Sequence, residues 1–152
     1  DGRHAAARQL MIKLLIEARR GDEAMQVLRE GLQLLPQQAN WAMALARMQV
    51  ERKDYSGAWQ TLEHSMPAGG ASADYQGFAG HVLQRMGRNK EAAAHYLAAA
   101  RLAPNEGRWW LGLGLSYDAE GMVNESREAL QRAKASGTLS AELMAIADQR
   151  LR

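Results

Sequence analysis

Residues 107–121 read GRWWLGLGLSYDAEG and combine a run of apolar and small residues with a polar end. Leu111 and Leu115 are four residues apart, which is the spacing that places side chains on one face of an α-helix. Glu120 and Gly121 then supply a polar turn with a residue suited to end a helix. This segment is predicted to be a helix followed by a turn, and the same plan recurs upstream at a fixed distance.

The plan recurs every 34 residues without a gap. Positions one period apart, which we call a register column, are similar in size and polarity, and this indicates that they take the same place in successive structural units. Four such columns are Ala24, Ala58, Ala92 and Ser126; Leu28, Leu62, Tyr96 and Leu130; Gly31, Ser65, Ala99 and Ala133; and Ile12, Ala46, Gly80 and Gly114. The small columns predict places where two helices lie close together, because a larger side chain would force them apart.

Each period is predicted to form two helices joined by a polar turn, with the second helix ending near Pro or Gly. Four helical hairpins are expected over about 5–38, 39–72, 73–106 and 107–140. Ser140 is predicted to cap a ninth helix over residues 141–151, which has one apolar and one polar face. The chain, residues 1–152, is interpreted as a single helical-repeat domain. Because it opens at Asp1 without Met, we expect it to be a fragment of a longer protein.

The composition favours an all-α fold. The chain has 28 Ala but only nine β-branched residues, and Ala favours helices whereas Val, Ile and Thr favour strands. The absence of Cys excludes disulfides, thiolate metal sites and cysteine nucleophiles. The 19 basic and 17 acidic residues are too evenly balanced to indicate a nucleic acid or an anionic membrane as partner. No apolar run approaches the ~20 residues that cross a membrane, so no direct membrane insertion of this segment is expected.

Two motifs resemble those of the tetratricopeptide repeat, a helical hairpin of 34 residues. Trp110-x-x-Leu113-Gly114-x-x-Tyr117 is similar to the signature of its first helix, and Ala92-x-x-x-Tyr96 followed by Pro104 to that of its second. Ala24-x-x-x-Leu28 with Pro36 repeats the second motif upstream. The departures are Ile12 where a small residue is usual, Ser126 in place of Ala, and the lack of a Trp-like residue at Arg8 or Gln76.

The resemblance covers nearly the whole chain. It implies a right-handed solenoid of about four helical hairpins plus a C-terminal capping helix, and a non-enzymatic protein–protein interaction scaffold.

The last third of the chain also resembles the C-terminal repeats of MshN-type proteins, which act in mannose-sensitive haemagglutinin (MSHA) pilus biogenesis, a bacterial type IV pilus system. The similar segments are residues 105–113, 135–143 and 149–151. This resemblance implies a role in pilus assembly with pilus-assembly components as partners. It also implies a bacterial periplasmic location, with an anchor in the inner membrane supplied by upstream residues. The composition by itself leaves the compartment unknown.

In a helical-repeat solenoid the first helix of each repeat lines the concave face, where partners bind. The period predicts a peptide-binding groove lined by Lys13, Asn40, Met43, Arg47, Asp74, His81, Gln84, Arg85, Arg108, Leu111 and Leu115. The groove has a basic bias, and its apolar contact points are Met43, Leu111 and Leu115. It suits an extended or helical protein segment with some acidic residues.

No catalytic, metal-binding or cofactor-binding constellation is predicted. The four His residues form no pair at metal-ligand spacing, and Glu91 with His95 is interpreted as a pair on a helix surface. The predicted groove lacks the aromatic residues that stack on nucleic-acid bases, so no nucleic-acid partner is expected. Two alternatives stay open: an adaptor or chaperone unrelated to pili, and a regulatory domain of another assembly or enzyme.

The first predicted helix is apolar around about two-thirds of its circumference, since Leu10, Met11, Ile12, Leu14, Leu15 and Ile16 lie within it. The end of a solenoid should be apolar on one side only. We therefore expect the second apolar side to pack on upstream residues or on another copy of the chain.

Overall fold

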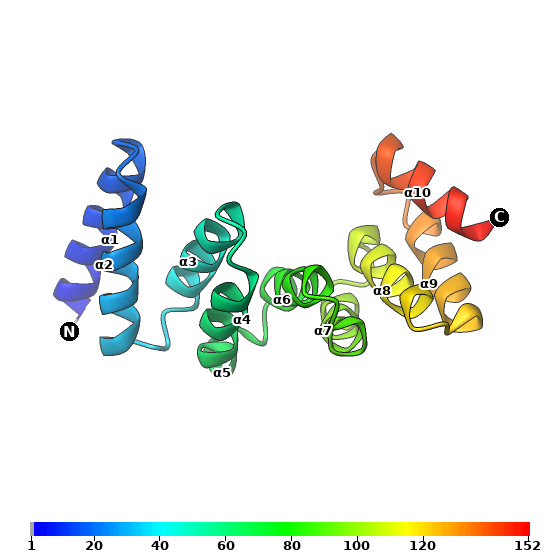
Figure 1. The fold of residues 1–152 in the computed structure, drawn as a ribbon, viewed down its shortest axis with the longest axis horizontal. Helices are drawn as coiled ribbons and strands as arrows, with labels where there is room; N and C mark the ends of the chain where they lie inside the picture. Colours follow the sequence, from blue (N-terminus) through cyan, green and yellow to red (C-terminus); the bar gives the residue numbers. More distant parts are fainter. Residues whose placement is uncertain (1) are drawn as a thin grey trace. The chain divides into compact units, whose positions relative to one another are not determined.

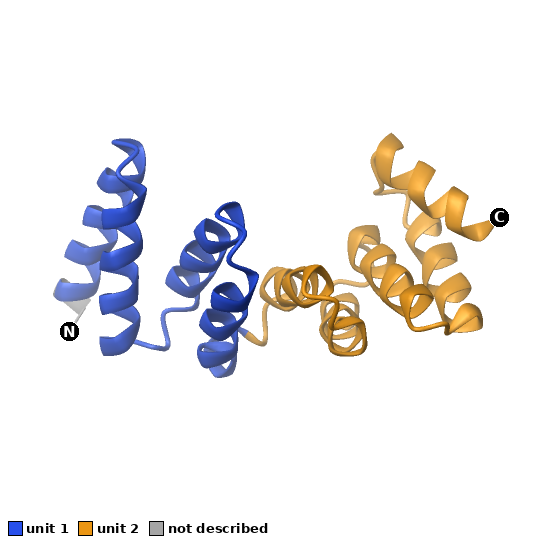
Figure 2. Cartoon of the chain, in the orientation of Figure 1, with its two compact units in different colours: residues 1–69 blue, residues 70–152 orange. Residues whose placement is uncertain are grey.

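The computed structural model describes residues 2–152, with side chains described from residue 4 onward. All regular secondary structure in this range is helical, and it contains no strand (Figure 1). The predicted all-α class is confirmed. The chain divides between Gly69 and Gly70 into two compact units, unit 1 and unit 2, which are coloured separately in Figure 2. The interpretation as one domain with four repeat boundaries stays a prediction.

Unit 1 contains two helical hairpins and one additional turn of helix. Its helices are α1 (Gly2–Glu17), α2 (Gly21–Leu34), α3 (Ala39–Glu51), α4 (Tyr55–His64) and α5 (Met66–Gly69). Packing follows the chain order, α1 on α2, α2 on α3 and α3 on α4. The 34-residue period does not predict α5, which contacts α3 and α4. Pro67 is compatible with this short helix because a helix leaves the N–H groups of its first turn without internal partners.

Unit 2 contains two further hairpins and a terminal helix. Its helices are α6 (Ala73–Arg85), α7 (Asn89–Leu102), α8 (Gly107–Ala119), α9 (Val123–Ala135) and α10 (Ala141–Leu151). α7 packs between α6 and α8, and α10 packs on both α8 and α9. The Ser140 side chain accepts a hydrogen bond from the Leu143 backbone N–H at 3.2 Å, so the predicted N-cap of the last helix is confirmed.

Each hairpin turns through one residue in the left-handed region, and these four residues are spaced by the period. They are Arg19, Lys53, Gly87 and Gly121, with φ of 58°, 63°, 76° and 75°. The residue after each donates its backbone N–H to a carbonyl of the preceding helix, as Met122 does to Tyr117 at 2.9 Å. This bond closes the helix end in the manner of a Schellman motif. The period therefore specifies the turn as well as the helices.

The columns of small residues lie where helices meet, as predicted. Ala24, Ala58 and Ala92 are fully buried. A Cβ on Gly114 would lie only 2.7 Å from the Leu130 side chain, which shows why this position of the column is small in the fourth hairpin. Ser126, which departs from the alanine pattern, is 3% exposed and donates its hydroxyl to the Gly114 carbonyl at 2.8 Å. That hydrogen bond removes the cost of burying the hydroxyl group.

Candidate protein-interaction surface

The first helices of the hairpins, α1, α3, α6 and α8, carry register columns that are not buried in any repeat. Asn40, Asp74 and Arg108 are exposed, as are Lys13, Arg47 and Arg85, whereas His81 and Leu115 are half-buried. Their chemistry changes from one repeat to the next, while the buried columns stay small or apolar. A scaffold with a constant core and a variable accessible surface is suited to carry a binding site. We call the predicted groove residues on these four helices the first-helix surface and describe it for each unit separately.

In unit 1, the first-helix surface consists of Lys13, Asn40, Met43 and Arg47. Gln9 of α1 connects the two helices because its side-chain oxygen accepts hydrogen bonds from two residues of α3. The donors are Trp41 Nε1 at 2.5 Å and Asn40 Nδ2 at 3.4 Å. Gln9 thus ties Asn40 to α1, the helix that carries Lys13, and the half-buried Met43 is the apolar contact of this part.

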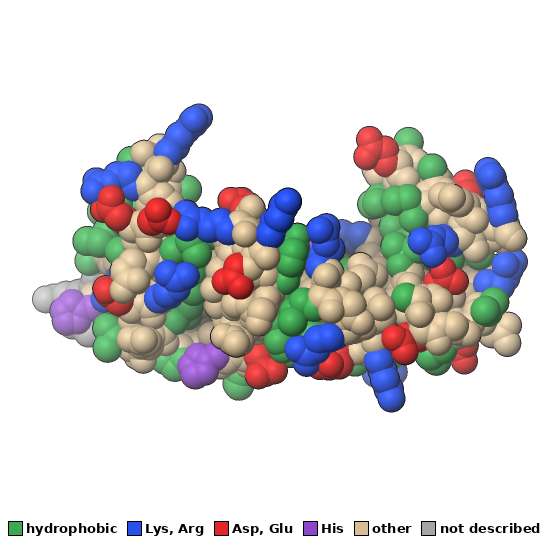
Figure 3. Space-filling model, in the orientation of Figure 1, with side chains coloured by type: hydrophobic (Ala, Val, Ile, Leu, Met, Phe, Trp, Pro, Cys, Tyr) green, Lys and Arg blue, Asp and Glu red, His purple; other side chains and the backbone are tan. Residues whose placement is uncertain are grey.

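In unit 2, Arg108 is held by carboxylates on both sides. Its guanidinium lies 2.7 Å from Asp74, one period upstream, and 2.8 Å from Glu106. The same group lies over the Trp109 ring, 4.1 Å from its centroid. The predicted basic contribution of Arg108 is therefore largely neutralised by its neighbours. On the face drawn in Figure 3, Lys and Arg side chains are likewise interspersed with Asp and Glu.

His81 adds an aromatic surface rather than a charge at neutral pH. Its ring stacks on Phe78, with centroids 6.2 Å apart and planes inclined by 23°. Burial lowers the pKa of His81, and the nearby Arg85 lowers it further. The imidazole is therefore neutral at pH 7. The sequence reasoning missed Phe78, although its position three residues before His81 on a helix is the spacing that brings two rings together.

The Gln84 side chain makes two hydrogen bonds within unit 2. Its side-chain nitrogen donates to Ser116 Oγ at 3.1 Å, and its oxygen accepts a longer hydrogen bond of 3.4 Å from the Tyr96 hydroxyl. Burial raises the pKa of Tyr96, so the hydroxyl keeps its proton and acts as the donor. Gln84 thus links α6 to α7 and α8, and it is half-buried.

The burial of Leu111 differs from what the predicted groove requires. It was expected to be an apolar contact point, but it is only 4% exposed and belongs to the core. The reason is that α8 contacts α6, α7, α9 and α10, which leave its apolar side chains little access to solvent. Leu115, one turn further along the helix, is half-buried and remains the apolar contact of this part.

Two hollows in unit 2 lie among residues that the groove prediction did not consider. A hollow of about 420 Å³ is lined by Lys90, Leu97, Tyr117 and Met122, among others. A second hollow of about 300 Å³ shares Leu97 and Tyr117 with the first and adds residues of α9. The sequence signal for these hollows is the set of alanines beside Leu97, because small neighbours leave space around a large side chain.

Within residues 2–152 no group of three or more His, Asp or Glu residues could hold a metal ion. No helix in that range is both long and apolar enough to cross a membrane.

The buried columns of these hairpins stay constant in character and the accessible columns vary. This combination is typical of helical-repeat proteins, which stack hairpins of one kind. Comparison with known families makes this specific. One family model, described as tetratricopeptide repeat, matches residues 15–81, and a second of the same description matches residues 73–106. The chain carries tetratricopeptide repeats, and its fold is that of a tetratricopeptide-type solenoid.

Solved structures show the same fold. A double mutant of MamA has a TM-score of 0.84 at 18% identity, with 96% of this chain and 82% of that chain covered. MamA 41-end from Desulfovibrio magneticus RS-1 gives a TM-score of 0.80 at 18% identity, with coverages of 97% and 86%. The Sgt2 TPR domain from Aspergillus fumigatus gives 0.68 at 17% identity, with coverages of 74% and 76%. These likenesses establish the fold alone. No curated protein sequence matches the chain.

Proposed function

We propose that the protein is a non-enzymatic scaffold that binds a segment of a partner protein on its first-helix surface. The observation that supports this most is the contrast between columns. Lys13, Arg47, His81 and Leu115 occupy one register column and differ in charge, shape and polarity, and none of the four is buried. Packing holds the buried columns to small or apolar residues, so the exposed columns are the positions whose side chains can be suited to a partner.

The charged and apolar side chains of the first-helix surface support a particular chemistry for the proposed partner. Arg108 is paired with Asp74 and Glu106, and the other exposed cations of the first-helix surface are Lys13, Arg47 and Arg85. Met43 and Leu115 supply half-buried apolar contacts. In each unit, a segment that combines acidic and apolar residues fits these groups, because carboxylates pair with the cations while apolar side chains cover the apolar contacts.

The test is selection from a displayed library of random peptides, followed by measurement of the affinities of the selected peptides. The selected peptides should be acidic, and the triple variant Lys13→Glu, Arg47→Glu, Arg85→Glu should bind them at least ~10-fold more weakly. The matched control reverses three exposed cations on second helices, Arg29→Glu, Lys90→Glu and Arg101→Glu, and should bind as the wild type does. Equal loss in both triple variants would mean that net charge rather than the first-helix surface governs binding, and the proposal would be wrong.

For the biological setting we propose a role in assembly of an MSHA-like type IV pilus, on the periplasmic side of an inner membrane that upstream residues would reach. The support is the sequence resemblance of residues 105–113, 135–143 and 149–151 to MshN-type proteins. Residues 105–113 include the start of α8, residues 135–143 include the start of α10, and residues 149–151 are the last three residues of α10. Deletion of the gene in its host should abolish surface pili of this type, and a normal piliation level in the deletion strain would contradict this setting.

A further inference from the structure

The exposed side of α1 is an apolar face. Leu10, Met11 and Leu14 are 57%, 52% and 55% exposed. Together with Ala7 they form one stripe along the helix, because Leu10 and Met11 lie three and four residues after Ala7, and Leu14 lies four and three residues after them. Such contiguous apolar surface is rare on a monomeric soluble domain and marks an interaction site.

Three register columns on this side of α1, those of Ala7, Arg8 and Met11, are buried in the second and fourth hairpins. One period on, Ala7, Arg8 and Met11 correspond to Trp41, Ala42 and Leu45; three periods on, they correspond to Trp109, Trp110 and Leu113, and all six of these are at most 9% exposed. Within each unit the preceding hairpin covers them: a Cβ on Gly31 would lie 2.9 Å from the Trp41 ring, and one on Gly77 would lie 2.0 Å from the Trp109 ring. The exposed face of α1 therefore corresponds to the surface that, in the second and fourth hairpins, packs on the preceding hairpin.

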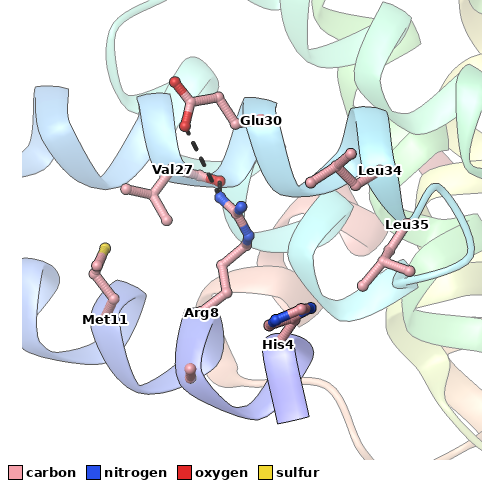
Figure 4. A pocket seen from close by; sticks show the side chains of 8 residues that line it. His4, Arg8, Met11, Val27, Glu30, Leu34 and Leu35 are labelled. Carbon is pink, nitrogen blue, oxygen red and sulfur yellow. Dashed lines mark hydrogen bonds and ion pairs between the residues drawn. The ribbon is translucent and has the colours of Figure 1, made fainter. Parts of the chain in front are cut away.

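A hollow beside this stripe is already formed. It measures about 700 Å³ and is lined by α1 and α2, with Ala7 at the column that holds Trp in the second and fourth hairpins. Figure 4 shows Arg8 reaching across to α2, where its guanidinium donates to the Val27 carbonyl at 3.1 Å and lies 3.9 Å from Glu30. The small side chain of Ala7 leaves space, so an occupant should bring a large apolar side chain to this place.

The charges of α1 oppose its own dipole. The described part of its first turn has no acidic residue and its last turn has no basic one; Glu17 stands at the carboxyl end and His4 near the amino end. An acidic group is unfavourable at the C-terminus of a helix and favourable at the N-terminus. A second copy of α1 in antiparallel orientation reverses this, because it brings Glu17 beside the positive end of its neighbour.

We propose that the occupant is a second copy of this chain, joined through an antiparallel α1–α1 contact. A two-fold axis between Leu10 and Met11 places Leu14 of each copy opposite the second copy's Ala7, where the hollow has room for it. The same axis sets Glu17 at the second copy's first turn. Such an interface uses one patch twice and closes on itself, so it yields a dimer rather than a fibre. The interface uses none of the residues of the first-helix surface, although Lys13 of that surface lies on the same helix.

Sedimentation velocity over a concentration series tests the proposal on the full chain. The wild type should shift with concentration from 16.8 kDa to twice that mass. Leu14→Glu should raise the dissociation constant at least ~100-fold, because the symmetric contact loses two buried leucines and gains two buried charges. Val123→Glu, at a position of similar exposure (59%) on α9, should dimerise as the wild type does. Circular dichroism should show both variants folded.

Cysteine cross-linking tests the orientation, and the chain offers a clean background because it has no Cys. A mixture of Ala7→Cys and Leu14→Cys proteins should form a mixed disulfide between the two variants. Ala7→Cys alone should not cross-link, since an antiparallel contact separates the two copies of residue 7 by about 10 Å along the helix. A disulfide between two Ala7→Cys chains, or a wild type that stays monomeric at every concentration, would overturn the proposal. A strict monomer would assign the face to another helix of a longer chain or to another protein.

Discussion

The first and fourth hairpins share one pattern of columns but bury different parts of it. In the fourth hairpin Trp109, Trp110 and Leu113 are at most 9% exposed, whereas in the first hairpin Met11, the register equivalent of Leu113, is 52% exposed. The difference arises because α8 has neighbours on several sides and α1 packs mainly on α2. The period thus specifies how a hairpin folds, and its neighbours decide which faces become core.

The turns differ between the two units as well. In unit 1 the left-handed position is held by Arg19 and Lys53, and in unit 2 by Gly87 and Gly121. Only glycine adopts this conformation without steric cost. Unit 2 therefore has the less strained turns, in addition to the more completely covered first helices.

The largest expected effect on stability comes from shortening the side chain at one register column, compared between the first and fourth hairpins. Leu113→Ala should lower the free energy of unfolding by about 2–5 kcal/mol, because it empties space in a packed core. Met11→Ala, in the same column, should cost less than ~0.5 kcal/mol in monomeric protein because the side chain is already exposed. Urea denaturation at low protein concentration measures both. Equal losses would contradict the assignment of different burial to one column.

The turns provide a second comparison. Gly121→Ala should destabilise the protein by about 1 kcal/mol, because no atom beyond the two neighbouring residues lies within 4 Å of the added Cβ and only the backbone conformation opposes the substitution. Lys53→Gly should stabilise by about 0.5–1 kcal/mol, since relief of the strain outweighs the added entropy of the unfolded chain. Thermal unfolding of the two variants gives the sign, and opposite signs to these would refute the turn argument.

The ion pair on the unit 2 surface should contribute little to stability and more to binding. Asp74→Asn should change the unfolding free energy by about 0.2–1 kcal/mol, because both partners are more than half exposed. The variant removes a carboxylate beside Arg108, so it should bind the selected acidic peptides more tightly. Weaker binding by this variant would mean that Asp74 itself contacts the partner.

The smallest expected effect is a pH dependence confined to unit 2. Burial lowers the pKa of both His81 and His95 from 6.5, so the folded state disfavours their protonation. Above pH 6.5 the lowered pKa values have little effect on the free energy of unfolding, because both histidines are neutral in the folded and the unfolded chain. Below pH 6.5 the unfolded chain takes up protons more readily than the folded one, so stability is progressively lost. Urea unfolding at pH 7.5 and 5.5 should show a smaller difference in unfolding free energy for the double variant His81→Gln, His95→Gln than for the wild type. His64→Gln, at an exposed position in unit 1, serves as the control, and an unchanged pH effect in the double variant would contradict this origin.

The sequence was enough to predict the helical hairpins, because the 34-residue columns carry turn, packing and capping signals together. It also predicted that α1 has more apolar surface than one hairpin can cover. It misplaced Leu111, since a period shows that a residue lies on a first helix but not how many neighbours that helix has.

Other features of the site depend on side-chain contacts. The neutralisation of Arg108 by Asp74 requires two residues one full period apart to meet, and their charges alone suggested only a mixed surface. The stacking of Phe78 on His81 was within reach of helical spacing but was not considered. The left-handed turns at Arg19 and Lys53 carry no glycine signal, so only their register with Gly87 and Gly121 could have revealed them.

The central claim is that the protein binds its partner through the first helices of the hairpins. Amide hydrogen exchange with and without a saturating selected peptide tests it most directly, because each helix reports separately. We expect added protection along α1, α3, α6 and α8 and little change in α2, α4, α7 and α9. Protection concentrated on the second helices, for example around Leu97 of α7, would contradict the claim and move the binding site to the hollows of unit 2.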